Sequence, residues 1–203
     1  MILKTKLFGH HYQFGSIREV MAKANEEKSG DKLAGIAADS AEERVAAKVV
    51  LSHLTLEDLR NYPAVPYEED EVTRIIQDDI NERIYSEFKH MSVMEFREWL
   101  LDQHTTGDMI RRASRGLTSE MISAVTKLMG NLDLIYAAKK IRITAHCNTT
   151  IGLPGTFSAR LQPNHTTDDI DGIMASTMEG FSYGVGDADR KSTRLNSSHT
   201  NLS

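Results

Sequence analysis

Residues 156–162 read TFSARLQ, and this stretch decides the fold class of the 203-residue chain. Phe157, Ala159 and Leu161 alternate with polar residues, which is the two-residue period of a β-strand. Pro163 cannot continue a strand ladder, so the strand should end there. Apolar residues then recur at helical spacing: Ile170, Ile173, Met174, Met178 and Phe181. The pattern predicts one strand followed by one helix, which is the unit of an α/β protein.

The ends of this predicted helix carry their own signals. Thr167 or Asp168 can cap its start, and Gly184 stands near its end. Gly186 and Asp187 then resemble the turn into a second strand, but the residues after them do not supply one.

The residues before Ile141 have a different pattern, which is typical of helices. A Ser or Thr stands three residues before an acid in several places, as in a capping box: Ser16 with Glu19, Ser40 with Glu43, Thr55 with Asp58, and Ser92 with Glu95. Thr118 is expected to cap a further helix. One longer amphipathic helix is expected where six apolar residues recur: Val72, Ile75, Ile76, Ile80, Ile84 and Phe88. We therefore expect a helical N-terminal region over residues 1–141 and a second region over 142–188.

The last residues differ in composition from the rest. Residues 190–203 read RKSTRLNSSHTNLS, which offers only two leucines and cannot form an apolar face. The string also resembles translated sequencing adapter. We expect residues 189–203 to be a disordered, non-native tail; the alternative is a genuine flexible polar tail.

Composition and charge exclude several classes of function. Lys and Arg number 24 against 29 Asp and Glu, and the net charge of −5 does not favour a nucleic-acid partner. The single cysteine, Cys147, cannot form an internal disulfide, and neither a signal region nor a membrane-length apolar run is present. These observations favour the cytoplasm and predict no membrane partner.

Arg160 and Gln162 are the strongest candidate site residues. They share one face at the carboxyl end of the predicted strand, where α/β proteins place their active sites. Burying an unpaired Arg is costly, and a Gln beside it can both donate and accept hydrogen bonds. The pattern fits a site for a small polar ligand, and nothing in it excludes a surface strand whose polar face is solvated.

Other candidates favour structural roles. His10 and His11 are adjacent and would point in different directions, so we expect surface residues and no metal site. The acidic run at residues 68–71 is expected to cap a helix rather than to bind a divalent ion. Cys147 beside His146 does not make a catalytic dyad, because a base must be positioned in space. No catalytic residue is assigned.

Several stretches resemble the large subunit of ethanolamine ammonia-lyase. The agreement is collinear from residue 1 to about 188 and includes SGDKLAGIAA at 29–38, ERVAAKVVLS at 43–52, NTTIGLPGTFSARLQPN at 148–164 and EGFSYGVGDA at 179–188. The resemblance implies a helical N-terminal region followed by a (β/α)8 TIM barrel. Residues 142–188 would then supply the loop, first strand and first helix of the barrel. A complete barrel needs about 250 residues, so we expect an N-terminal fragment that is mostly α-helical as it stands.

The resemblance also implies an activity. The family is an adenosylcobalamin-dependent lyase that converts ethanolamine to acetaldehyde and ammonia by a radical mechanism. Its ARLQPN motif places an arginine and a glutamine on the substrate, which here are Arg160 and Gln162. The cobalamin site would lie mostly outside this chain. Implied partners are the small subunit and further large subunits in a homo-oligomer, and the implied location is the cytoplasm, within a bacterial microcompartment in some hosts.

Two functional hypotheses follow from these features. The first is the catalytic large subunit, truncated here and inactive alone. The second is a non-catalytic helical interaction or assembly module. The genomic DNA after codon 188 separates them: an in-frame continuation into a second strand ending in Asn-Pro supports the first, and a real stop codon after Ser203 supports the second.

Overall fold

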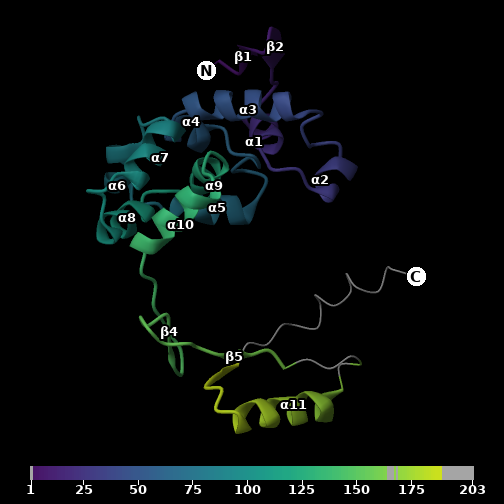
Figure 1. Cartoon of the computed structure of the whole chain (residues 1–203), viewed down its shortest axis with the longest axis vertical. Coiled ribbons are helices and arrows are strands. Elements are labelled where there is room, and N and C mark those ends of the chain that lie inside the picture. Colours follow the sequence, from purple (N-terminus) through teal and green to yellow (C-terminus); the bar gives the residue numbers. More distant parts are fainter. Residues whose placement is uncertain (1, 164–166, 168, 189–203) are drawn as a thin grey trace. The chain divides into compact units, whose positions relative to one another are not determined.

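The computed structural model describes residues 2–163, 167 and 169–188 (Figure 1). The chain divides into two compact units, residues 1–141 (unit 1) and residues 142–203 (unit 2). The tail expected at residues 189–203 lies outside the described residues.

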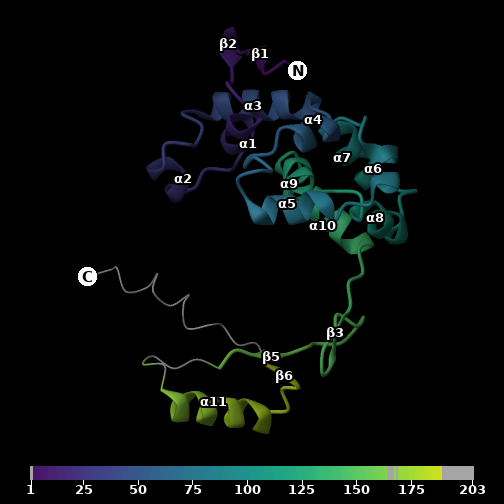
Figure 2. The ribbon, with the colours of Figure 1, turned by 180° about the vertical axis from the view of Figure 1, so that it is seen from behind.

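Unit 1 begins with a β-hairpin and continues as a series of helices. Its elements are β1 (Lys4–Leu7), β2 (His10–Gln13), α1 (Ile17–Lys23), α2 (Ser29–Leu33), α3 (Ala41–His53), α4 (Leu56–Asn61), α5 (Glu71–Asp78), α6 (Glu82–Phe88), α7 (Val93–Leu101), α8 (Gly107–Ser114), α9 (Ser119–Lys127) and α10 (Asn131–Lys140). Figures 1 and 2 both show α9 in the midst of the other helices.

The hairpin corrects the expectation of helices from the first residue. β1 and β2 are antiparallel, with Lys4 opposite Gln13. The two connecting residues, Phe8 and Gly9, have φ of 53° and 80°. Positive φ at both positions is typical of the tight turn that joins twisted strands. The expectation is wrong for residues 4–13 because strands of four residues contain too few alternations to reveal their period.

The predicted helix caps are confirmed. At each of four starts a hydroxyl accepts a hydrogen bond of 3.0–3.1 Å from the backbone N–H three residues on: Ser16, Ser40, Thr55 and Ser92. Thr118 does the same for Met121 at 3.2 Å. Each such cap stabilises its helix by about 1 kcal/mol, so local sequence fixes where many of these helices begin.

The single long helix expected between Val72 and Phe88 is wrong. α5 ends at Asp78, and the side chain of Asn81 starts α6 by accepting a hydrogen bond from Ile84 N at 3.1 Å. Asn competes with a continuing helix because its short amide can bond the backbone beyond it. The apolar period therefore runs through a break between two helices.

The core of unit 1 is formed by the helices around α9. Its largest fully buried side chains are Val20, Leu51, Leu56, Leu59, Val93, Met121 and Val125. Three rings, Phe88, Phe96 and Trp99, pack with centroids 5.2–5.7 Å apart. Aromatic contacts of this geometry add to the stabilisation from burial alone.

Unit 2 contains a small hairpin and a strand–helix–strand unit. Its elements are β3 (Ala145–His146), β4 (Thr150–Ile151), β5 (Arg160–Leu161), α11 (Ile170–Ser182) and β6 (Asp187–Ala188). β3 and β4 are antiparallel, whereas β5 and β6 are parallel. Two parallel strands joined through a helix form a βαβ unit.

The predictions for unit 2 are confirmed in part. Of the strand expected at residues 156–162, only Arg160 and Leu161 form a ladder. The helix is present, and its cap is Asp169, which accepts a hydrogen bond from Gly172 N at 2.8 Å, and not Thr167. Asp168, the other predicted cap, lies outside the described residues. A second strand, β6, is present and is two residues long, although the sequence pattern predicts none.

None of the helices that the structure describes combines the length and the apolar character needed to cross a lipid bilayer.

Gly116 marks a close approach within unit 1. The turn between α8 and α9 meets α6 there, and a Cβ on Gly116 would lie 2.6 Å from Tyr85 N and 2.9 Å from Ile84 C. Both are backbone atoms of α6, so neither can move without a shift of the helix. Asn81 N also donates to Arg115 O at 2.9 Å beside this contact.

We predict that Gly116→Ala lowers the free energy of unfolding by about 1–3 kcal/mol, because the added methyl group overpacks this contact. Urea denaturation of the 203-residue chain, followed by circular dichroism, measures the change. Gly30→Ala in α2 is the matched control, since a Cβ there has nothing within 4 Å. Equal destabilisation by the two substitutions would contradict the packing described.

Candidate functional site

The orientation of β5 is set by Leu161. Its side chain lies against α11 at Gly180, where an added Cβ would be 2.5 Å from Leu161 Cδ2. Gly180 is buried within the helix. The missing side chain at this glycine lets strand and helix touch, so Leu161 faces α11.

Arg160 therefore lies on the other face of the strand. Successive side chains of a strand point to opposite faces, so Arg160 is turned away from α11. Gln162 follows the strand directly, and both Arg160 and Gln162 are exposed while Leu161 is half-buried. The described residues alone do not enclose a ligand beside them.

β6 adds an acid to the same face. The register pairs Arg160 with Asp187, and paired residues of neighbouring strands point to the same side of a sheet. Asp187 is only 7% exposed. We use the term polar face for the side of the β5–β6 pair that carries Arg160 and Asp187, with Gln162 directly after the strand.

The carboxylate of Asp187 is held by the turn between β3 and β4. Asn148 N donates to its Oδ1 at 2.8 Å, Thr149 N donates to its Oδ2 at 3.1 Å, and Thr149 Oγ1 also donates to Oδ2. Asn148 Nδ2 donates to Gly186 O at 2.8 Å. These hydrogen bonds join the hairpin to the βαβ unit.

The same hydrogen bonds set the charge of the polar face. The Thr149 hydroxyl, and then the backbone N–H groups of Asn148 and Thr149, hold the pKa of Asp187 below its ordinary value. Asp187 is therefore an anion near neutral pH. A carboxylate whose pKa is lowered is a poorer general base than an ordinary one.

Other sequence candidates take structural roles. His10 and His11 are both exposed on β2. Asp70 accepts a hydrogen bond from Thr73 N at 2.7 Å and starts α5, which confirms capping by the acidic run. Cys147 is exposed. Within the described ranges no group of three His, Cys, Asp or Glu side chains is arranged to hold a metal ion.

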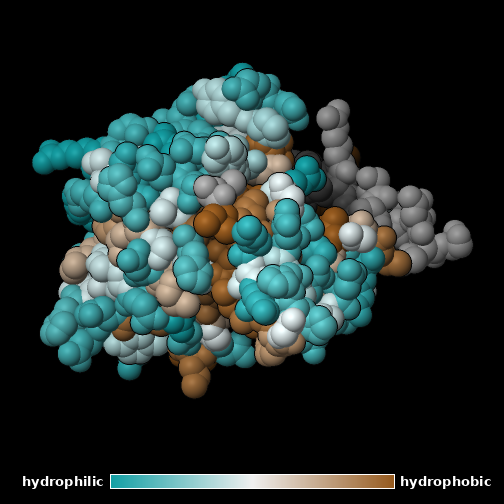
Figure 3. Space-filling view, turned by 90° about the horizontal axis from the view of Figure 1, so that it is seen from above, coloured by the Kyte–Doolittle hydropathy of each residue, from teal (hydrophilic) through white to brown (hydrophobic). Residues whose placement is uncertain are grey.

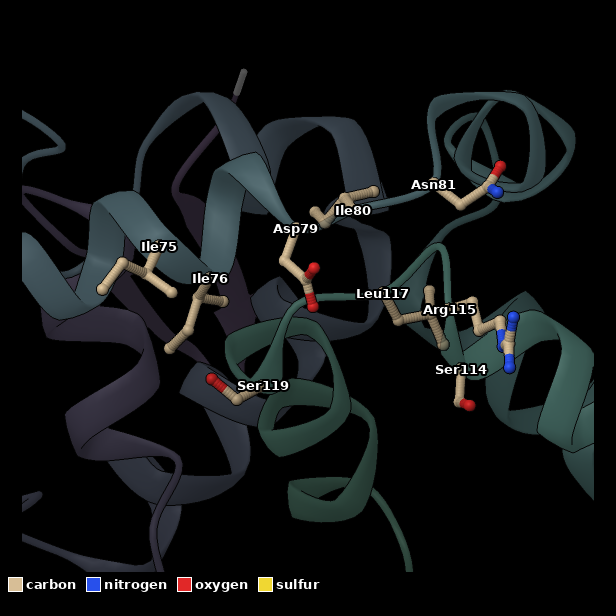
Figure 4. Close-up of a pocket in the computed structure, with 9 residues that line it drawn as sticks. All are labelled: Ile75, Ile76, Asp79, Ile80, Asn81, Ser114, Arg115, Leu117 and Ser119. Carbon is tan, nitrogen blue, oxygen red and sulfur yellow. The ribbon is translucent and has the colours of Figure 1, made fainter.

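A cleft in unit 1 is less suited to chemistry. It has a volume of about 690 Å³ and lies between α5, the turn after it and the start of α9 (Figure 4). Its ionisable side chains are Asp79 and Arg115, and Figure 4 shows their charged ends pointing in different directions. Polar groups that do not converge cannot fix the orientation of one ligand.

Comparison with known proteins gives the family. A family model described as ethanolamine ammonia lyase large subunit (EutB) matches residues 12–189. The chain belongs to this family. The resemblance seen in the sequence is thereby confirmed.

Curated relatives of the family match over most of this chain. It is 57% identical to the ethanolamine ammonia-lyase large subunit of Escherichia coli (strain K12) and 56% identical to that of Salmonella typhimurium (strain LT2), each over 188 residues. The matches cover 93% of this chain and 42% of each relative. The chain thus spans less than half the length of the curated relatives it matches.

Sequence reasoning missed Asn148, Thr149 and Asp187 as parts of one arrangement. Asp187 and Thr149 are 38 residues apart. No spacing rule joins residues so far apart, and only the strand pairing brings them together. The weak signal was the Gly186–Asp187 pair, which reads as the start of a strand.

We predict that the hydrogen bonds around Asp187 weaken in acid. The pKa of Asp187 in the folded chain lies below the unfolded value of about 3.9. The stabilisation is therefore fully present above that value and is lost as the pH falls through the folded pKa. The carboxyl ¹³C resonance of Asp187, followed by NMR against pH, should titrate with a midpoint below 3.9.

Thr149→Val is the control for this titration, because it removes the hydroxyl donor and keeps the shape of the side chain. Its midpoint should rise towards the ordinary value. A midpoint at or above about 3.9 in the parent chain would contradict the hydrogen bonding described.

Proposed function

We propose that this chain is the N-terminal part of the catalytic large subunit of an adenosylcobalamin-dependent ethanolamine ammonia-lyase, and that Arg160 and Gln162 bind ethanolamine. The observation that carries the site assignment is the contact of Leu161 with Gly180, which turns Arg160 to the face opposite α11. The match to curated large subunits supports the substrate and the reaction.

The donors and acceptors of the substrate decide how the two residues share it. Ethanolamine carries an ammonium group at neutral pH, and an ammonium group only donates hydrogen bonds. Gln162 Oε1 can accept a hydrogen bond from this ammonium group. The Arg160 guanidinium can only donate, so its partner would be the hydroxyl oxygen of the substrate. Two fixed partners at the two ends of the molecule orient the C–H bonds between them.

Asp187 supports this arrangement through its charge. Its carboxylate is ionised and lies on the face that carries Arg160. An anion at this position offsets the repulsion between the guanidinium and a cationic substrate. Asp187 thus acts as a positioning residue.

The βαβ unit fits the start of a (β/α)8 barrel. In such a barrel the helices lie outside and the strands line the interior. The polar face is the side of β5 and β6 turned away from α11, so it would face the interior at the level where substrates bind.

The cofactor requires surfaces other than the polar face. Adenosylcobalamin supplies the radical chemistry when it is bound. A corrin ring needs a broad, mostly apolar surface, whereas the polar face offers a guanidinium, an amide and a hydrogen-bonded carboxylate. These residues do not fit the cofactor, and we assign none of them to it.

Exposed apolar side chains on α10 and α11 support the binding of other protein subunits. On α10, Leu132 and Ile135 are 80% and 64% exposed, and on α11 Ile170 and Met178 are 75% and 62% exposed. Figure 3, a view from above in which α10 and α11 cannot be made out, shows other apolar side chains gathered in a band on a mostly hydrophilic face. We propose the small subunit and further large subunits as partners, in the bacterial cytoplasm and inside a microcompartment where the host builds one.

The chain alone should be inactive, because the polar face is open.

We predict that Arg160→Ala in the complete large subunit, assembled with its small subunit and adenosylcobalamin, lowers kcat/KM for ethanolamine about 10- to 100-fold. The loss corresponds to one hydrogen bond from a charged donor, worth about 1.5–3 kcal/mol. Arg160→Lys should also lower kcat/KM, because an ammonium group does not reproduce the planar fork of a guanidinium. Acetaldehyde formation is the measurement.

Arg83→Ala is the matched control, since Arg83 is exposed on α6 in unit 1. It should leave the kinetics unchanged. Parental kcat/KM in the Arg160→Ala enzyme would remove the site assignment.

A further inference from the structure

A second cleft in unit 1 gathers positive charge. It has a volume of about 800 Å³ and is lined by the end of α1, α3, the end of α9 and the start of α10. Three lysines, Lys28, Lys48 and Lys127, stand in its lining against one carboxylate, Glu26, which leaves a net charge of +2. Its volume is in the range of small-molecule sites.

Lys127 is the central group of this cleft. It lies in the last turn of α9, is half-buried, and donates a hydrogen bond to Asn25 Oδ1. Within the part of the chain that the structure describes, this neutral amide is its one hydrogen-bond acceptor. An ammonium group has three donors, and partial burial without an anion is costly. Lys127 therefore retains capacity for an anionic ligand.

The charge of Lys127 is compensated only in part by its surroundings. Burial lowers its pKa, the like charges of Lys28 and Lys48 lower it further, and Asp31 opposes them only in part. An anion placed among the three lysines would offset both the burial and the repulsion.

The remaining carboxylate does not block the cleft. Glu26 bonds Lys48 Nζ at 2.6 Å and lies 4.0 Å from Arg44 Nε, but its side chain is 73% exposed. An ion pair at such exposure contributes little to stability. Lys48 can therefore exchange Glu26 for a ligand at low cost.

The backbone at the two helix ends beside the cleft already has hydrogen-bond partners, so a ligand would be held by side chains. Asn131 starts the ten-residue helix α10, and the carboxylate of Asp133 in its first turn already accepts a hydrogen bond from Gly130 N at 3.1 Å. At the end of α9, Leu128 N donates to Val125 O and Met129 N donates to Thr126 O, each at 3.1 Å. Leu128, Met129 and Leu134 add an apolar wall.

We propose that this cleft binds a small organic phosphate, with Lys28, Lys48 and Lys127 holding the phosphate group and the apolar wall holding the organic part. Lysine recognises phosphate as a point charge and needs no fixed fork geometry. The proposal does not depend on the proposed function, because it rests on residues of unit 1 alone.

Phenyl phosphate is the probe that tests the proposal. Calorimetric titration of the 203-residue chain should show saturable binding at one site, and inorganic phosphate should displace the probe. Lys127→Gln should weaken binding about 10-fold or more, because a hydrogen bond to a charged group is lost. The NMR-detected pKa of Lys127 should rise when the probe binds.

Lys139→Gln is the matched control, since Lys139 is exposed near the end of α10 and does not line the cleft. It should bind as the parent does. Lys28→Gln, also exposed, should weaken binding and decides the question if Lys127→Gln does not fold. Absence of saturable binding, failure of phosphate to compete, or parental affinity in the folded cleft variants would overturn the proposal.

Discussion

The contact between Leu161 and Gly180 determines the direction of every side chain on β5. A two-residue strand has only two faces to offer, and one of them is taken by α11. Leu161 occupies that face because Gly180 leaves room for it. Arg160 must then project from the opposite face, beside Asp187 on β6. The proposed substrate site therefore depends on a glycine that touches no substrate.

Charge on the polar face follows from this geometry. Asp187 alone on a surface would be an ordinary acid, but the β3–β4 turn surrounds it with donors from Asn148 and Thr149. The carboxylate stays ionised and ties the hairpin to the βαβ unit. The lysine cleft of unit 1 has the reverse character, since Lys127 is partly buried beside other cations and has a neutral partner. Donors from the chain itself hold the Asp187 carboxylate, whereas the lysine cleft is proposed to bind an external anion.

Local features of the fold could be predicted from the sequence, and distant ones could not. The caps at Ser40 and Thr55 were readable because donor and acceptor lie three residues apart. The helix break at Asn81 was missed because the apolar period continues through it. Arg160 and Gln162 were predicted as site residues from alternation and from a family motif, and they stay a prediction. The pairing of β5 with β6 depends on residues 27 positions apart, Arg160 and Asp187. Hydrophobic period carries no information about such pairing.

A crystal structure of the complete large subunit with ethanolamine bound would show which side chains hold the substrate. We predict that Leu161 packs against Gly180, that an Arg160 nitrogen lies within about 3.2 Å of the substrate hydroxyl, and that Gln162 Oε1 lies equally close to its ammonium group. Ethanolamine bound away from Arg160, or Leu161 facing the substrate in its place, would contradict this prediction.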